Sequence, residues 1–300
     1  LTSERASARK ENAGREPAPR EIVFRGTLEE VNDNFYAEMW TDGLPVFPPT
    51  VEHIERFLRY TQRKPDEVIG VCPPDNREAT VWNIAATGVM AGCRPEYMPL
   101  LLAVVEAVTD PEFRLQDAGS TPGWEPLITV SGPIANQLDF NSGASVMRIG
   151  RRANSSVGRF LRLILRNMAG FRFAPGAGDK GSIAQNFFVA LAENEEACRD
   201  IGWQPYSADR GFKPGDNVVT VQSVVSVSPP LIVSKTRPLS RKVGALRLIT
   251  SVVLSTVSNF DAKPIWPSDP FLPRNRAAPL PAAIISLAVP SGASKVSSPS

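Results

Sequence analysis

The stretch that most constrains the fold is Ala79–Glu106, ATVWNIAATGVMAGCRPEYMPLLLAVVE. It contains two apolar runs of helical character that meet at one cysteine. The first run, about Val81–Ala91, is rich in alanine and glycine, whose small side chains let neighbouring backbones pack closely. The second run extends to about Val108 and is apolar nearly all round, which is typical of a buried helix. We therefore expect both helices in the hydrophobic core.

Strands and helices alternate on either side of this pair. Apolar residues at helical spacing predict helices over Leu28–Trp40 and Val51–Arg63, and a clear amphipathic helix covers Val157–Met168. Short apolar runs predict strands at Val68–Val71, Pro126–Gly132, Phe187–Ala192 and Val218–Val225. This alternation predicts an α/β fold, with a mixed sheet and helices packed against it.

The two ends of the chain differ in composition from the middle. Residues 1–20 are charged and alanine-rich without periodic apolar positions, so we expect a disordered N-terminus. Residues 226–300 contain no glutamate, are dominated by serine and proline, and suggest a regular element only near Leu246–Val257. We expect an irregular C-terminal tail there. A natural extension and a frameshift both give such a composition, and the abrupt loss of acidic residues favours the frameshift. A single α/β domain is thus predicted over residues 21–225.

Composition also limits the class of function. The net charge of +2 gives no reason to expect a nucleic acid or a membrane surface as partner. The three cysteines form no CxxC pair, which is typical of a reducing compartment and not of a disulfide scaffold. We see no secretory signal and no apolar run of the roughly 18 residues that a membrane helix needs. We therefore expect a cytoplasmic location.

The histidine content restricts the chemistry further, because His53 is the only histidine. With Thr50 as the N-cap of its helix, His53 lies in the first turn and is expected to face solvent. A Ser-His-Asp or Cys-His device would therefore have one poorly placed base, and zinc sites of His and Cys lack ligands. We predict no metal site, and the sequence specifies no cofactor. Any chemistry must depend on carboxylates, a thiol, arginines or backbone donors.

Cys93 is the best single candidate for such chemistry. Arg94 and Pro95 follow it, and proline is favoured at the first position of a helix. Cys93 would then lie at the positive end of the second core helix, where a thiolate is stabilised and Arg94 could bind an anionic substrate. The alternative is a small core residue between packed helices, which the apolar surroundings favour slightly.

A second candidate site precedes the amphipathic helix, whose N-cap is expected at Asn154–Ser156 and whose end is expected at Gly170. Glycine turns, hydroxyls and arginines lie ahead of a helix N-terminus, which attracts anions. The residues expected to bind a carboxylate or phosphate are Asn141, Ser142, Gly143, Arg151, Arg152 and Asn154. A loop capped for structural reasons is the alternative. Arg159, Arg162 and Arg166 are expected on the solvent-exposed face of the helix.

Carboxylates at two further places are candidates for proton transfer. The run Glu193–Glu196 directly follows the predicted strand Phe187–Ala192. Its carboxylates and amide could bind a cation, Asn194 could contact substrate, and Glu193 could act as general base. A solvated helix start is the alternative, because glutamates favour first turns. Asp42 is the other catalytic candidate, although its TDGLP context is more typical of a turn residue.

Three segments together resemble a bacterial protein family associated with UGSC-type thiol or selenol proteins and sometimes labelled thioredoxin-like. They are TDGLPVFPPT at Thr41–Thr50, MAGCRPEYMP at Met90–Pro99 and AENEEA at Ala192–Ala197, and the resemblance covers roughly Leu28–Val224. It marks Asp42, Cys93, Glu96, Tyr97, Asn141, Ser142, Arg152, Asn154, Glu193 and Asn194, and it ends after about Val225. The residues give the thioredoxin label no support, because the chain has no CxxC.

These candidates lead to three hypotheses. The first is a thiol-linked oxidoreductase acting on a small anionic or carbonyl substrate, with Cys93 as nucleophile or redox thiol and Glu193 handling protons. The second is a lyase or hydrolase that uses a carboxylate base without the thiol. The third is a non-catalytic binding subunit whose partner is a separate UGSC-type thiol or selenol protein, as the resemblance implies.

Overall fold

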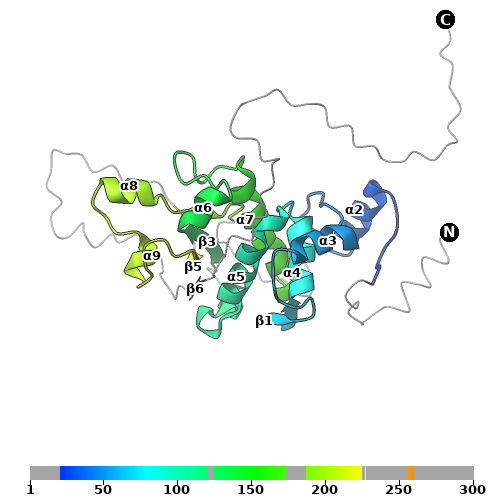
Figure 1. The fold of residues 1–300 in the computed structure, drawn as a ribbon. Coiled ribbons are helices and arrows are strands. Elements are labelled where there is room, and N and C mark those ends of the chain that lie inside the picture. Colours follow the sequence, from blue (N-terminus) through cyan, green and yellow to red (C-terminus); the bar gives the residue numbers. More distant parts are fainter. Residues whose placement is uncertain (1–20, 120–123, 173–186, 225–226, 228–255, 260–300) are drawn as a thin grey trace, which may run out of the picture. The chain divides into compact units, whose positions relative to one another are not determined.

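A computed structural model describes residues 21–119, 124–172, 187–224, 227 and 256–259 (Figure 1). All of these described residues belong to one compact unit. The predictions for residues 1–20, and those for most of residues 226–300, fall outside the described part of the chain. The described residues confirm the α/β class, with helices packed on a small mixed sheet.

Three helices of the N-terminal half are capped by threonines, as their sequences suggest. They are α2 (Leu28–Ala37), α3 (Val51–Leu58) and α4 (Val81–Met90), and they follow Thr27, Thr50 and Thr80. Each threonine hydroxyl accepts a hydrogen bond from the N–H three residues later, at 3.3, 3.3 and 3.2 Å. These bonds satisfy one of the otherwise unpaired donors at each helix start.

The centre of the core is the pair α4 and α5 (Met98–Thr109), which lie side by side as predicted (Figure 1). A 3₁₀ turn at Pro95–Tyr97 precedes α5. The amphipathic helix α7 (Arg152–Ile164) packs against both and continues as a π-helical turn at Leu165–Ala169. The short helices α6 (Pro133–Gln137), α8 (Glu195–Asp200) and α9 (Tyr206–Asp209) lie between strands in the sequence.

The sheet has the strand order β4-β3-β5-β6, with the bounds β3 (Glu125–Ser131), β4 (Leu191–Ala192), β5 (Val218–Val224) and β6 (Thr256–Asn259). β3 pairs in parallel with β4 and antiparallel with β5, and β5 pairs antiparallel with β6. A separate antiparallel hairpin joins β1 (Val68–Cys72) to β2 (Arg77–Thr80).

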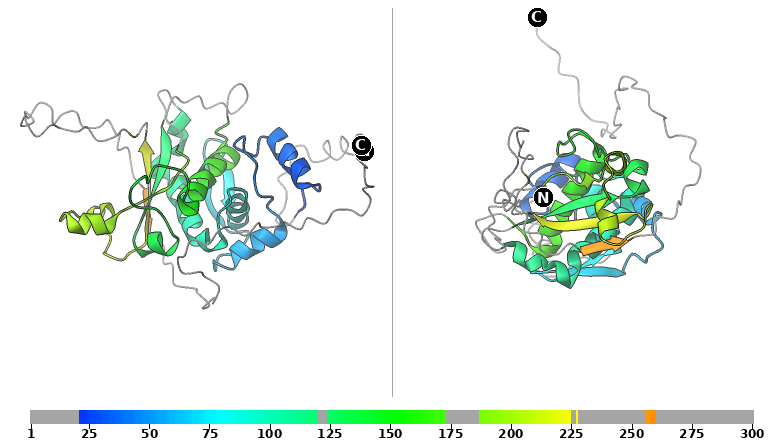
Figure 2. Two further views of the ribbon diagram at one scale, coloured as in Figure 1. Left: turned by 90° about the horizontal axis from the view of Figure 1, so that it is seen from above. Right: turned by 90° about the vertical axis from the view of Figure 1, so that its left-hand side faces the viewer.

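The two faces of the sheet have different surroundings. Ile128 and Val221 belong to the face that joins the main core beside α5, and Figure 2 (left) shows the strands on one side of α5 and α7. The opposite face carries Leu127, which packs in a small second cluster with Phe187 and Val224. Among the described residues no helix is long and apolar enough to cross a membrane.

Several elements differ from the sequence predictions. The helices predicted over Leu28–Trp40 and Val51–Arg63 end earlier, at Ala37 and Leu58. Only Leu191–Ala192 of the predicted strand Phe187–Ala192 pair with a neighbour. β6 comes from the tail that was expected to be irregular, because its backbone extends the ladder of β5. α7 begins at Arg152, so the N-cap predicted at Asn154–Ser156 is wrong.

The predicted helix end at Gly170 is confirmed. Gly170 has φ +81°, and its N–H bonds the carbonyl of Leu165. A Cβ on Gly170 would lie 2.2 Å from the carboxyl of Asp75, so both the backbone conformation and the space require glycine.

Candidate functional site

Three segments that are far apart in the sequence meet at the turn Gly92–Cys93. One face of α7 presents Arg152 and Ser156 to this turn. Arg152 Nε donates a hydrogen bond to the Gly92 carbonyl at 3.1 Å. Cys93 Sγ donates a hydrogen bond to the Ser156 carbonyl at 3.4 Å. The third segment is residues 39–47, hereafter the strap. Two ring atoms of its Phe47 lie 3.8 Å from where a Cβ on Gly92 would be.

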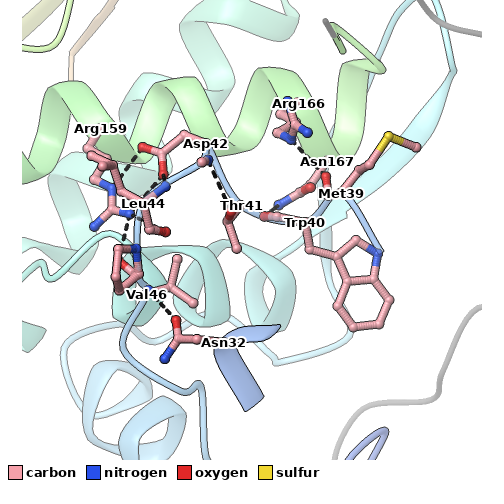
Figure 3. Close-up of polar contacts among 12 residues, drawn as sticks. Asn32, Met39, Trp40, Thr41, Asp42, Leu44, Val46, Arg159, Arg166 and Asn167 are labelled. Carbon is pink, nitrogen blue, oxygen red and sulfur yellow. Dashed lines mark hydrogen bonds and ion pairs between the residues drawn. The ribbon is translucent and has the colours of Figure 1, made fainter. Parts of the chain in front are cut away.

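The strap is fixed to α7 by an ion pair between Asp42 and Arg159 (Figure 3). Arg159 donates from Nε and from one terminal nitrogen to the two carboxylate oxygens of Asp42, both at 2.8 Å, and to the Pro45 carbonyl at 2.8 Å. The side chains are only 19% and 11% exposed. Burial alone would raise the pKa of Asp42, but the hydrogen bonds and charge of Arg159 outweigh it and the pKa is lowered.

Two residues of the π-helical turn hold the other end of the strap. Arg166 Nε donates to the Met39 carbonyl at 2.7 Å, and Asn167 Nδ2 donates to the Trp40 carbonyl at 3.0 Å (Figure 3). From the α2 side, Asn32 accepts the Val46 N–H at 2.7 Å. The strap is therefore a fixed part of the fold.

These contacts change the roles expected for several residues. Asp42, a catalytic candidate, is an ion-pair partner within the fold. The prediction that Arg159, Arg162 and Arg166 form a solvent-exposed face is wrong. Arg159 holds the strap, Arg162 pairs with the Glu125 carboxylate of β3, and Arg166 is buried.

Cys93 is buried, with 5% of its surface exposed. Gly92, at φ +79°, and Cys93 donate their N–H groups to the Val89 and Gly88 carbonyls, which is the Schellman arrangement that ends α4. Cys93 thus closes the negative end of one helix. Burial raises the pKa of the Cys93 thiol to about 12, and the nearby charges of Arg152 and Arg159 only partly oppose this.

The predicted lowering of the Cys93 pKa at a helix start is therefore wrong, and the geometry favours the alternative of a packed core residue. Arg94 directly precedes the 3₁₀ turn as expected, but its guanidinium pairs with Glu96. The Tyr97 hydroxyl, in the same turn, has its pKa raised by burial to about 12.

Arg152 differs from its neighbours. Within the described part of the chain its guanidinium has no carboxylate partner and donates one hydrogen bond, to the Gly92 carbonyl. No side chain caps α7, and its first turn carries no acidic residue, so Arg152 lies at an unneutralised positive helix end. The adjacent Arg151 pairs with Asp139, and both side chains are largely exposed.

The remaining residues of the predicted anion loop have structural contacts. Asn154 is fully buried; its side chain accepts the Asn141 N–H at 2.8 Å and donates to the carbonyls of Asn141 and Ala190 at 3.0 and 2.9 Å. Asn141 Oδ1 accepts the Gly143 N–H at 3.0 Å, which closes a turn around Ser142. Of the six residues predicted for this loop, Arg152 is the one that contacts the Gly92–Cys93 turn.

The second group of candidates lies at the end of β3. Glu193 accepts hydrogen bonds from Ser131 Oγ at 2.6 Å and from the Tyr206 N–H, and Asn194 Oδ1 accepts the Ala197 N–H at 2.9 Å as the cap of α8. Glu195, from the same predicted group Glu193–Glu196, accepts the Gly132 N–H at 2.6 Å. Both Glu193 oxygens are thus occupied in joining the segment of α8 and α9 to β3.

No cluster of three or more His, Cys, Asp or Glu suited to a metal ion occurs among the residues that the structure describes. His53 lies in the first turn of α3 as expected, with Nδ1 3.3 Å from the Pro48 carbonyl. The comparisons with known proteins found no matching family, curated protein or solved structure. The resemblance described above therefore stays a prediction.

Proposed function

We propose that the chain binds a small ligand with an oxyanion, such as a carboxylate, at the Gly92–Cys93 turn, with Arg152 as the anchor. The observation that carries the proposal is the charge pattern. Arg94 and Arg159 are paired with Glu96 and Asp42, whereas Arg152 has no such partner among the described residues. A guanidinium with free donors at a positive helix end is suited to bind a carboxylate or phosphate.

In this proposal the chain is a binding protein, and Cys93 is part of its core. A reactive thiol or selenol would come from a separate UGSC-type protein, which the sequence resemblance supports. The lyase or hydrolase hypothesis has less support, because both oxygens of Glu193 already accept hydrogen bonds from Ser131 and Tyr206.

A thiol-linked oxidoreductase is the second candidate, and one observation favours it. Burial raises the pKa of Cys93, and the charges of Arg152 and Arg159 act to lower it, so a conformation that hydrates this thiol would leave these charges to favour the thiolate. Turnover of a small carbonyl or carboxylate substrate that Cys93→Ser abolishes would support this candidate over the binding protein.

The test of the binding proposal is a titration with acetate and with inorganic phosphate, followed by chemical shifts of the backbone amides. Arg152→Gln is expected to weaken binding about tenfold, because one charge-assisted hydrogen bond contributes about 1.4 kcal/mol or more. Arg151→Gln is the matched control, since Arg151 is the neighbouring residue and is already paired with Asp139. Equal affinities of the two variants, or no binding by the unaltered chain, would contradict the proposal.

A further inference from the structure

The anion site has an exposed aromatic ring beside it. Phe47 is 61% exposed, although it follows Val46, which is 4% exposed and anchored through its N–H to Asn32. The strap thus alternates an inward and an outward apolar side chain on a fixed backbone. An isolated exposed apolar residue is common on protein surfaces. The exposure of Phe47 alone therefore does not indicate a binding site. What distinguishes Phe47 is its position beside Arg152.

Phe47 and Arg152 both lie beside Gly92. The guanidinium bonds the Gly92 carbonyl at 3.1 Å, and two ring atoms of Phe47 lie 3.8 Å from where a Cβ on Gly92 would be. Gly92 has no side chain, and Phe47 and Arg152 are both exposed, so the ring and the guanidinium border the same surface turn.

We infer that the ligand is an amphipathic carboxylate, with its carboxylate on Arg152 and an aromatic or short aliphatic group on Phe47. This inference rests on the proposed function and adds the class of the ligand. The charge of Arg152 requires an anion, and the exposed ring gains from covering apolar surface. An inorganic anion would contact the Arg152 guanidinium and leave the Phe47 ring exposed.

The experiment compares acetate, phenylacetate and inorganic phosphate as probes, with the dissociation constants measured by amide chemical shifts on the full chain. The unaltered chain is expected to bind phenylacetate about tenfold more tightly than acetate. Phe47→Ala is expected to remove this preference and to leave the affinity for acetate unchanged. Trp203→Ala is the matched control, because Trp203 is an exposed aromatic residue outside the strap, and this variant should keep the preference.

The outcomes separate the inference from the proposed function. Three outcomes would overturn the inference but not the proposed anion site. They are equal affinity for acetate and phenylacetate, binding of phosphate alone, and a preference for phenylacetate that remains in the Phe47→Ala variant. Absence of binding by all three probes, or acetate binding that does not change in Arg152→Gln, would overturn the proposed function and the inference with it.

Discussion

Cys93 owes its chemical character to its environment in the fold more than to the residues next to it in sequence. Arg94 and Pro95 suggest an activated thiol at a helix start, yet the amide of Cys93 completes the end of α4 and its side chain is buried against α7. Desolvation of a thiolate then exceeds the attraction of nearby arginines, and the pKa is raised to about 12. A buried, protonated thiol behaves as a small apolar residue.

This raised pKa predicts how stability depends on pH. The folded Cys93 thiol ionises near 12, whereas the unfolded thiol ionises at the ordinary value of 9.0. Its contribution to the free energy of unfolding is therefore fully present below pH 9 and is lost as the pH rises towards 12. When the pH rises from about 8 to about 10, the free energy of unfolding of the unaltered chain should fall by about 1.4 kcal/mol more than that of the Cys93→Ala variant.

Urea unfolding at the two pH values measures this difference. Cys198→Ala is the control, because Cys198 is partly exposed, and although its pKa is also raised, by partial burial and by Glu193 and Glu195, its removal should change the pH dependence less than Cys93→Ala does. An identical loss of stability in Cys93→Ala and in the unaltered chain would show that the thiol is not buried in the folded protein.

At the scale of elements, α7 and the turn that continues it are joined to the strap by hydrogen bonds from two arginines. Arg159 and Arg166 lie on the helix face that the amphipathic pattern assigns to solvent, but residues 39–47 cover that face and accept their hydrogen bonds. The helices themselves could be predicted, because apolar spacing and threonine caps are local signals. The pairing of Asp42 with Arg159 could not, because the two residues are 117 positions apart and nothing local indicates which helix the strap crosses.

The Asp42–Arg159 pair should stabilise the fold measurably. Asp42→Asn is expected to lower the free energy of unfolding by about 2 kcal/mol, between the values typical of exposed and buried pairs. Because the pKa of Asp42 lies below its ordinary 3.8, this contribution is present above pH 3.8 and is lost as the pH falls through the folded pKa.

A double-mutant cycle with Arg159→Met, read by urea unfolding, isolates the interaction between the two side chains. The exposed pair Arg151–Asp139 is the matched control, and Asp139→Asn should change stability by about 0.5 kcal/mol or less. Additive effects of Asp42→Asn and Arg159→Met would contradict a stabilising ion pair.

At the scale of the whole molecule, strand pairing was the least predictable property. The strands β3 and β5 are evident from their apolar runs, whereas for β6 the sequence indicates only a regular element near Leu246–Val257, without its type, bounds or partner. A four-residue edge strand depends on the neighbouring β5 and on α5, which it also contacts. The sheet thus includes Thr256–Asn259, which lie beyond residue 225, where the predicted domain ends.

This boundary gives the prediction at the largest scale. A chain ended after residue 225 loses β6 and leaves β5 as an unprotected edge, which is a site for pairing with other chains. We expect its free energy of unfolding to fall by roughly 2 kcal/mol or more, with greater aggregation. A chain ended after residue 263 keeps β6 and is the matched control, which should unfold with the stability of the full chain.

Urea unfolding and light scattering of the three chains measure both effects. Equal stability of the two shortened chains would mean that β6 does not contribute to the sheet and that the domain ends at β5.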